Sequence, residues 1–145
     1  DMRVDVLICG SGAAGVSAAI EAREAGADVL LVESLPRFGG ASAMSGGVVY
    51  AGGGTALQKA LKIDDSVEQM YRFIALAGAI HPPLDKIQLY CEQSVAHFDW
   101  LVAQGVPYSE KFSTSRELPM DGASLYFSGT EQAWPARELA QNDPF

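Results

Sequence analysis

Residues Val4 to Gly47 read VDVLICGSGAAGVSAAIEAREAGADVLLVESLPRFGGASAMSGG and contain the pattern from which the fold can be predicted. Its apolar start, VDVLIC, predicts a strand that leads into the glycine motif GSGAAG. A helix is expected to begin near Ala13, and a second strand, DVLLV, ends on Glu33. A strand, a glycine-rich turn, a helix and a second strand in this order form the context in which such a motif binds a dinucleotide.

Each glycine of the motif has a physical reason for its place. Gly10 lets the chain turn sharply off the strand, and Gly12 lacks the Cβ that would keep the backbone away from a pyrophosphate. Gly15 allows helix and strand to pack closely. The start of the helix presents unpaired N–H groups and the positive end of its dipole, so the anion needs no lysine.

Glu33 lies where an acidic residue of this motif accepts hydrogen bonds from a ribose hydroxyl. Its charge would also repel a 2′-phosphate, which disfavours NADP. The alternative is a glycine-rich turn that only joins a strand to a helix. The flanking strands, the helix and the position of Glu33 favour nucleotide binding over that alternative.

The residues after Glu33 predict a loop that presses against a cofactor. Gly39-Gly40 and Gly46-Gly47 frame Ser42 and Ser45, so the backbone can approach a ligand closely while hydroxyl groups bond to it. The alternative is a flexible surface linker. A linker would be more polar and would lack the apolar VVYA that follows.

GSGAAG, VES and GGASAMSGG together resemble the FAD-binding start of the fumarate reductase and 3-ketosteroid dehydrogenase flavoprotein superfamily. VVYAGGGTALQKA and YCEQSVAHFDWLVAQGVPYSEKF are most similar to its 3-ketosteroid Δ4-(5α)-dehydrogenase branch. The resemblance implies FAD, held without a covalent bond because neither histidine lies near the cofactor loop. The residues implied to touch FAD are Gly10, Gly12, Ala13, Ala14, Gly15, Glu33, Ser34, Gly39, Gly40, Ala41, Ser42, Ser45, Gly46 and Gly47.

The implied fold is α/β. A Rossmann-like FAD-binding βαβ unit with its cofactor loop would occupy residues 1–60, and a helical segment of the same domain residues 61–104. Short strands in a β-hairpin or meander would occupy residues 105–145 and lead towards a substrate or capping domain. The fold would be incomplete without further chain, supplied by the remainder of the same protein or by a second chain.

Local patterns predict two helices. Asp65 and Ser66 form a cap for the first. The second should begin near Pro83 or Leu84 and end at Gly105. Its apolar face would carry Leu84, Ile87, Cys91, Val95, Phe98 and Val102.

The cysteines and histidines do not predict a disulfide or a metal site. Cys9 and Cys91 are expected to be small core residues, because they lack the C-x-x-C spacing of a redox pair. Together with His81 and His97 they have no zinc-ligand spacing. His97 is expected to be a helix residue, not an acid or base, since the sequence identifies no titrating partner for it.

Composition excludes several classes of partner. Apolar residues make up 48% of the chain and charged residues 19%, with 10 basic against 18 acidic side chains and a net charge of −8. This balance argues against nucleic acid and anionic membranes. No apolar run is long enough for a membrane span and no targeting segment is evident, so the expected location is the cytoplasm.

Three functions remain open. The first is a flavin-dependent dehydrogenase that moves a hydride from a 3-ketosteroid to flavin N5 and leaves a conjugated enone. The second is an ene-reductase of a small unsaturated acid such as fumarate or urocanate, and the third is a non-catalytic dinucleotide-binding module. An acid reductase needs converging arginines, whereas the arginines here are scattered: Arg3, Arg23, Arg37, Arg72, Arg116 and Arg137.

No catalytic residue is assigned, since the resemblance implies that the acid and base lie mainly beyond residue 145. Tyr126 is a weak candidate for the substrate pocket. It belongs to a group of aromatic residues that line a pocket or fill an ordinary core, namely Tyr108, Phe112, Tyr126, Phe127 and Trp134.

Overall fold

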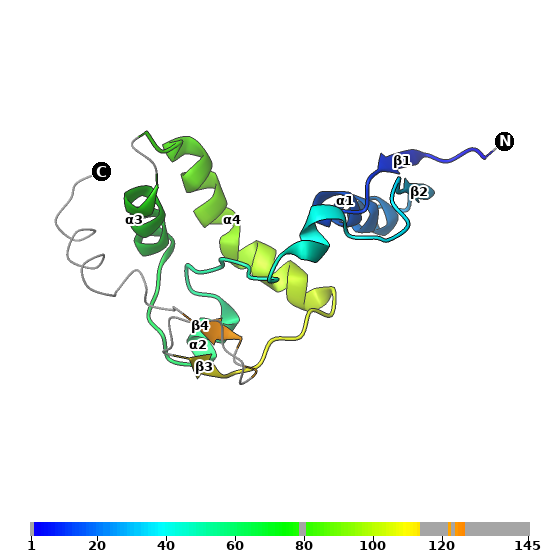
Figure 1. Ribbon diagram of the computed structural model, residues 1–145. Coiled ribbons are helices and arrows are strands. Elements are labelled where there is room, and N and C mark those ends of the chain that lie inside the picture. The colour runs from blue at the N-terminus through cyan, green and yellow to red at the C-terminus, as the bar shows by residue number, and fades with distance from the viewer. Residues whose placement is uncertain (1, 79–80, 114–121, 123, 127–145) are drawn as a thin grey trace. The chain divides into compact units, whose positions relative to one another are not determined.

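The computed structural model describes residues 2–78, 81–113, 122 and 124–126. The chain divides into two compact units, residues 1–49 and 50–145, and each is described by itself. The elements of Figure 1 are, in chain order, β1 (Val6–Cys9), α1 (Ala13–Glu24), β2 (Val29–Val32), the 3-10 helix η1 (Gly40–Met44), α2 (Ala56–Ala60), α3 (Val67–Ala77), α4 (Leu84–Ala103), β3 (Phe112–Ser113) and β4 (Leu125–Tyr126).

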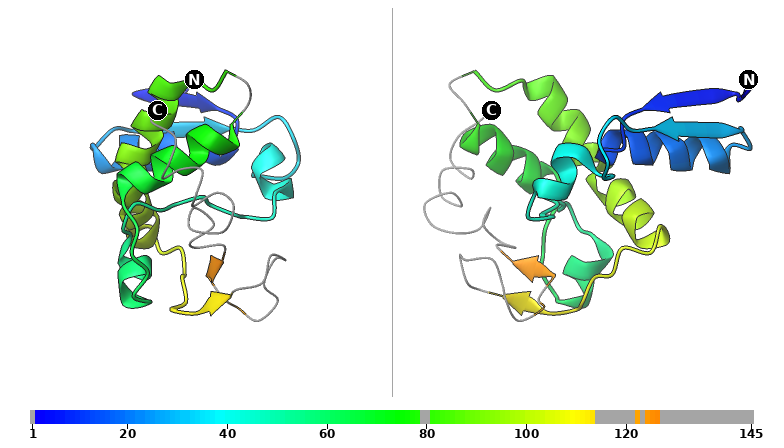
Figure 2. Two further views of the ribbon diagram at one scale, coloured as in Figure 1. Left: turned by 90° about the vertical axis from the view of Figure 1, so that its left-hand side faces the viewer. Right: turned by 45° about the vertical axis from the view of Figure 1, so that its right-hand side comes forward.

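The first unit is the predicted strand, helix and strand. β1 and β2 pair in parallel, in a register that runs from Val6 opposite Val29 to Cys9 opposite Val32. α1 connects the strands and lies along one side of the pair (Figure 2). The α/β class is therefore confirmed, and both glycine motif and loop stand at the carboxyl ends of parallel strands, where open α/β sheets bind ligands.

The prediction that Cys9 is a core residue is wrong for this part of the chain, where its side chain is exposed. Within residues 2–49, β1 pairs on one edge only, with β2. Leu7, on the same face as Cys9 because alternate side chains share a face, is also 58% exposed. The prediction assumed that Cys9 lies in a wider sheet whose faces are covered by other elements.

The second unit is built around α3 and α4, which pack on each other. Met70, Ile87 and Cys91 form the buried cluster between them. Ser66 caps α3 by accepting a hydrogen bond from the N–H of Gln69 at 3.2 Å, as predicted. α4 ends at Ala103, close to the predicted stop at Gly105.

A short helix that the sequence analysis missed, α2, follows the turn Gly52–Gly54. Thr55 and Gln58 form a capping box at its start. The Gln58 amide also donates to Asp65 Oδ2 at 2.7 Å, and that oxygen accepts from the N–H of Gly53 at 2.7 Å. The spacing T-x-x-Q of a capping box was the signal available in the sequence.

The prediction of a hairpin or meander near the end of the chain is wrong for the strands that the structure describes. β3 and β4 are parallel, with Phe112 opposite Leu125 and Ser113 opposite Tyr126. A hairpin needs antiparallel strands. Phe127 and Trp134 lie outside the described residues.

Candidate cofactor-binding site

The glycine turn has the geometry that the sequence required. Gly10 has a φ of 100°, a left-handed conformation that glycine adopts without strain. A Cβ on Gly15 would lie 1.9 Å from the carbonyl oxygen of Gly10 and 3.4 Å from Cγ2 of Ile8. Helix and strand therefore approach each other as closely as the predicted role of Gly15 demands.

The start of α1 offers donors to an anion. Among the described residues, nothing accepts a hydrogen bond from the N–H groups of Gly12, Ala14 and Gly15. The first turn of α1 contains no acidic side chain that would repel a phosphate. These unpaired groups and the helix dipole fit a pyrophosphate.

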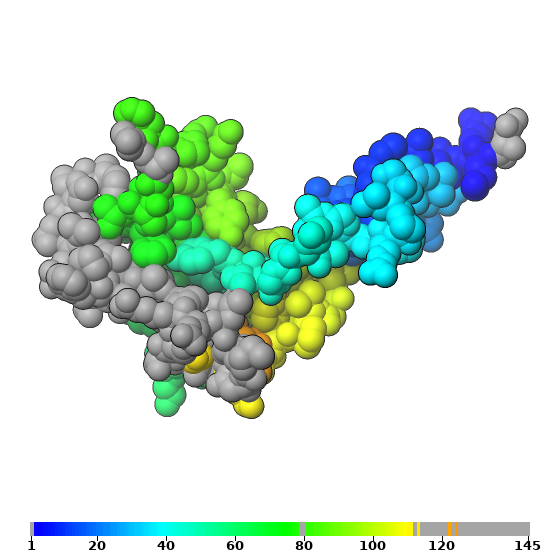
Figure 3. Space-filling model, viewed as in Figure 1, coloured from blue at the N-terminus to red at the C-terminus, as the bar shows by residue number. Residues whose placement is uncertain are grey.

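The predicted cofactor loop is tied directly to the glycine turn. The N–H of Gly39 donates to Ser11 Oγ at 2.9 Å, and the N–H of Ala13 donates to Ser42 Oγ at 3.0 Å. The surface of the loop, cyan in Figure 3, continues from that of the first strand and helix. A free surface linker would lack these bonds, so the loop is a fixed part of the site.

The loop itself is held by short-range contacts. Ser45 Oγ donates to the carbonyl of Ser42 at 2.9 Å and accepts from the N–H of Gly47 at 3.2 Å. Gly39 and Gly40 enter η1 with φ values of 103° and 50°. The paired glycines are thus used for backbone conformations that other residues rarely adopt.

Glu33 lies beside the glycine turn, as predicted, but its partners in the structure are protein groups. Oε2 accepts from Ser11 Oγ at 2.6 Å and from the N–H of Ser11 at 2.9 Å, while Oε1 accepts from the N–H of Leu35 at 3.0 Å. The hydrogen bond from the Ser11 hydroxyl, with those from the backbone of Leu35 and Ser11, lowers the pKa of Glu33 to about 2. The contact of Glu33 with a ribose stays a prediction.

Ser11 is the residue of this site that the sequence analysis missed. It occupies a variable position of the glycine motif, and its side chain touches both Glu33 and Gly39. The only signal in the sequence was a hydroxyl residue inside a glycine motif that is followed, after a helix and a strand, by an acidic residue. The predicted contact residues from Gly10 to Gly47 all lie in the same unit, and their donors, glycines and hydroxyls fit a dinucleotide.

We expect Ser42→Ala to weaken dinucleotide binding about fivefold. The hydroxyl that accepts from Ala13 keeps its own proton free to donate to a phosphate, and one such bond contributes about 1 kcal/mol. Isothermal titration of the FAD-free protein with FAD measures the change, with Ser17→Ala on α1 as the matched control. Equal affinities of Ser42→Ala and the unaltered protein would contradict this role.

The low pKa of Glu33 predicts a pH dependence of stability. Its value of about 2 lies below the ordinary 4.5, so the stabilisation is complete above pH 4.5 and is lost as the pH falls towards 2. The free energy of unfolding should fall less steeply in this window for Glu33→Gln than for the unaltered protein. Denaturant unfolding at a series of pH values measures both slopes, and parallel curves would contradict the assignment.

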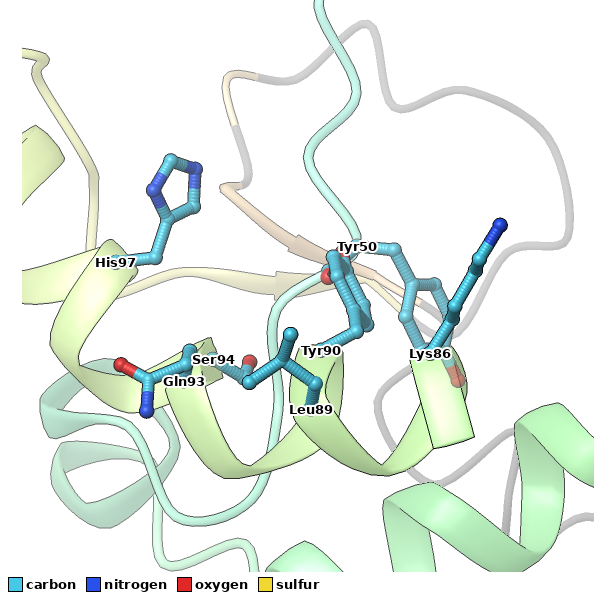
Figure 4. A pocket seen from close by; sticks show the side chains of 7 residues that line it. All are labelled: Tyr50, Lys86, Leu89, Tyr90, Gln93, Ser94 and His97. Carbon is cyan, nitrogen blue, oxygen red and sulfur yellow. Dashed lines mark hydrogen bonds between the residues drawn. The ribbon is translucent and has the colours of Figure 1, made fainter. Parts of the chain in front are cut away.

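A cavity of about 420 Å³ lies in the second unit, along α4. Figure 4 shows Lys86 and His97 towards opposite ends of a row of side chains that includes Tyr50 and Tyr90. The hydroxyl of Tyr90 donates to the carbonyl of Tyr50, and burial raises the pKa of the Tyr90 phenol. The lining residues are Tyr50, Lys86, Leu89, Tyr90, Gln93, Ser94 and His97.

His97 is one of the residues that line this cavity. His97 is exposed on α4, and its ring stacks on Trp100 with ring centres 6.2 Å apart. Tyr108 packs on Phe98 with ring centres 4.8 Å apart, which is an ordinary core contact. Tyr126 lies in β4.

Within the part of the chain that the structure describes, no three histidine, cysteine or acidic side chains form a group suited to a metal ion. No helix of the same residues has the length and apolar character needed to cross a membrane.

Residues 5–140 match the protein family described as FAD binding domain. The chain belongs to this family, and its cofactor is FAD, as predicted. The chain is 47% identical to the 3-ketosteroid-Δ4-(5α)-dehydrogenase of Rhodococcus jostii RHA1, solved in complex with 4-androstene-3,17-dione. The match has a TM-score of 0.82 and covers 99% of this chain and 30% of the other.

Two curated relatives are named for different reactions. The 3-oxo-5-alpha-steroid 4-dehydrogenase of Comamonas testosteroni is 40% identical over 134 residues, which are 88% of this chain and 24% of the relative. The urocanate reductase of Eggerthella lenta is 37% identical over 126 residues, 82% of this chain and 21% of the relative. The chain thus spans about a quarter of the length of these relatives, and the predicted resemblance to their superfamily is confirmed.

Proposed function

We propose that this chain is the N-terminal, FAD-binding part of a flavin-dependent dehydrogenase that converts a 3-ketosteroid into a conjugated enone. The observation that carries the proposal is the 47% identity, over 99% of the chain, to a 3-ketosteroid-Δ4-(5α)-dehydrogenase. A steroid dehydrogenase is also among the curated relatives. The glycine turn supplies the cofactor site that such a reaction needs.

The residues divide the work of binding FAD. The first N–H groups of α1 hold the pyrophosphate, and Glu33 accepts hydrogen bonds from the ribose. The loop from Gly39 to Gly47 covers the cofactor and supplies a hydroxyl donor at Ser42, while Ser45 holds the loop through its bond to the Ser42 carbonyl. Bound FAD supplies hydride acceptance at N5.

The binding of FAD is non-covalent in this proposal. Neither His81 nor His97 lies near the cofactor loop in the sequence, and the polar groups of the loop are hydroxyl and backbone groups. Acid precipitation of the purified protein should therefore leave the flavin in the supernatant. Flavin that stays with the precipitated protein would contradict this part of the proposal.

The substrate site is completed by further protein. A small-molecule substrate needs a closed, apolar pocket and an acid or base beside the reacting carbon. Among residues 2–49, the exposed faces of Leu7 and Val32 offer apolar surface on which further chain can pack, at 58% and 40% exposure. The groups that move the proton belong to that further chain. In this proposal residues 1–60 are the FAD-binding βαβ unit with its cofactor loop, residues 61–104 are the helical segment of the same domain, and residues 105–145 lead towards a substrate or capping domain.

A second candidate is an ene-reductase of a small unsaturated acid. The 37% identity to a urocanate reductase favours it. Its substrate would need arginines converging on a carboxylate. Among the described arginines, Arg23 lies near Asp28 at 3.9 Å and Arg72 pairs with Glu68 at 2.5 Å, each beside a carboxylate of its own unit.

Steady-state assays of the full-length natural protein separate the two candidates. We expect oxidation of saturated 3-ketosteroids with an artificial electron acceptor. Reduction of fumarate or urocanate with a reduced dye should be absent. The opposite pattern would replace the first candidate with the second, and inactivity in both directions with FAD bound would indicate a non-catalytic module.

A further inference from the structure

Among residues 2–49, Ser11 is the most enclosed, with 2% of its surface exposed. It stands between Gly10 and Gly12, where a packing role would need no hydroxyl. Its Oγ donates to Glu33 Oε2 at 2.6 Å and accepts from the N–H of Gly39 at 2.9 Å. One small side chain thus joins the glycine turn, the end of β2 and the entrance of the cofactor loop.

We propose that Ser11 is a positioning residue that fixes the Glu33 carboxylate and the loop Gly39–Gly47 in their FAD-binding arrangement before the cofactor arrives. The proposal rests on the binding of FAD and is independent of which substrate the protein oxidises or reduces. Ser11 itself need not touch the cofactor.

The direction of the hydrogen bonds is set by chemistry. An ionised carboxylate can only accept, and a backbone N–H can only donate. The single proton of the Ser11 hydroxyl must therefore point to Glu33, which leaves its lone pairs for Gly39. Because the carboxylate is charged, it polarises the hydroxyl and strengthens the bond from Gly39.

The anchored loop entrance has a consequence at α1. Gly39 and Gly40 are both left-handed, and a Cβ on Gly39 would lie 2.6 Å from Cβ of Ala43. This tight entrance directs η1 so that Ser42 Oγ reaches the N–H of Ala13 at 3.0 Å. Loss of the Ser11 hydroxyl would release the entrance and, with it, the position of Ser42 at the helix start.

Two substitutions of nearly equal volume separate positioning from packing. Ser11→Cys fills the same space but is a weak donor and acceptor, whereas Ser11→Thr keeps the hydroxyl. Ser17→Ala is the control for a serine on α1. The probe is FAD itself, added to the FAD-free form of the full-length protein.

We expect Ser11→Cys to raise the dissociation constant for FAD about tenfold and to speed hydrogen exchange of the amides in residues 39–47 of the FAD-free protein by a similar factor. Ser11→Thr should restore both quantities in large part, and Ser17→Ala should change neither. In Glu33→Gln, which lacks the charge, Ser11→Cys should have a smaller effect than in the unaltered protein.

The exchange rate is a readout that needs no turnover and no bound flavin. Unchanged loop exchange in Ser11→Cys would overturn the proposal. Fully additive effects of Ser11→Cys and Glu33→Gln on the dissociation constant for FAD would also overturn it. This second criterion does not use Ser11→Thr, so it applies even if that variant fails to fold. Absence of steroid oxidation by the unaltered protein, together with the expected faster loop exchange in Ser11→Cys, would instead count against the proposed function alone.

Discussion

Gly15→Ala is expected to destabilise the protein by at least about 3 kcal/mol, the upper end of the cost of overpacking a close contact. The new methyl group would lie 1.9 Å from the carbonyl oxygen of Gly10, far inside van der Waals contact. The neighbour is backbone, so it can give way only if β1 and α1 move apart. Thermal unfolding of the FAD-free full-length protein measures the loss.

The matched control is Ala18→Gly, which changes one methyl group at an exposed position of the same helix. It should cost only about 1 kcal/mol, the difference in helix propensity. An unfolding midpoint for Gly15→Ala equal to or above that of Ala18→Gly would show that strand and helix are less tightly packed than described.

Gly12→Ala is expected to keep the fold and to lose FAD affinity by about 10-fold to 100-fold. Gly12 has an ordinary backbone conformation, with φ −68° and ψ 176°. A Cβ there would lie 3.6 Å from Ser42 Oγ and 3.9 Å from the carbonyl of Gly39, which are ordinary contacts. The methyl group would nevertheless take the space between helix start and loop, where hydrogen bonds to phosphate contribute about 1.5–3 kcal/mol.

Titration with FAD and thermal unfolding of the same Gly12→Ala sample separate binding from folding. Ala18→Gly again serves as control, because it should lower the unfolding midpoint slightly and leave FAD affinity unchanged. Full affinity in Gly12→Ala would mean that the pyrophosphate does not approach the backbone at this turn.

The order of elements in the first unit could be predicted from the sequence, for a physical reason. The apolar strands, the three glycines of the motif and the helix start near Ala13 depend on residues that are close together along the chain. The same holds for Ser66 as the cap of α3 and for the end of α4 near Gly105. Local rules were sufficient wherever the partners were close in sequence.

The predictions failed where the contacts of a residue are with residues distant in sequence or with protein outside its own unit. Cys9 is exposed because its burial depends on elements that residues 2–49 do not provide. β3 and β4 are parallel, a direction that the turn-forming residues of the sequence did not reveal. Ser11 was missed because its partners Glu33 and Gly39 are far along the chain and meet only in the folded unit.

The most direct measurement is an anaerobic absorbance titration of the purified full-length protein, with FAD bound, using a saturated 3-ketosteroid. We predict loss of the oxidised-flavin band at about one equivalent of steroid, because hydride passes to the flavin and no electron acceptor is present. An unchanged spectrum, under conditions in which a chemical reductant bleaches the same band, would contradict the proposed ketosteroid dehydrogenase.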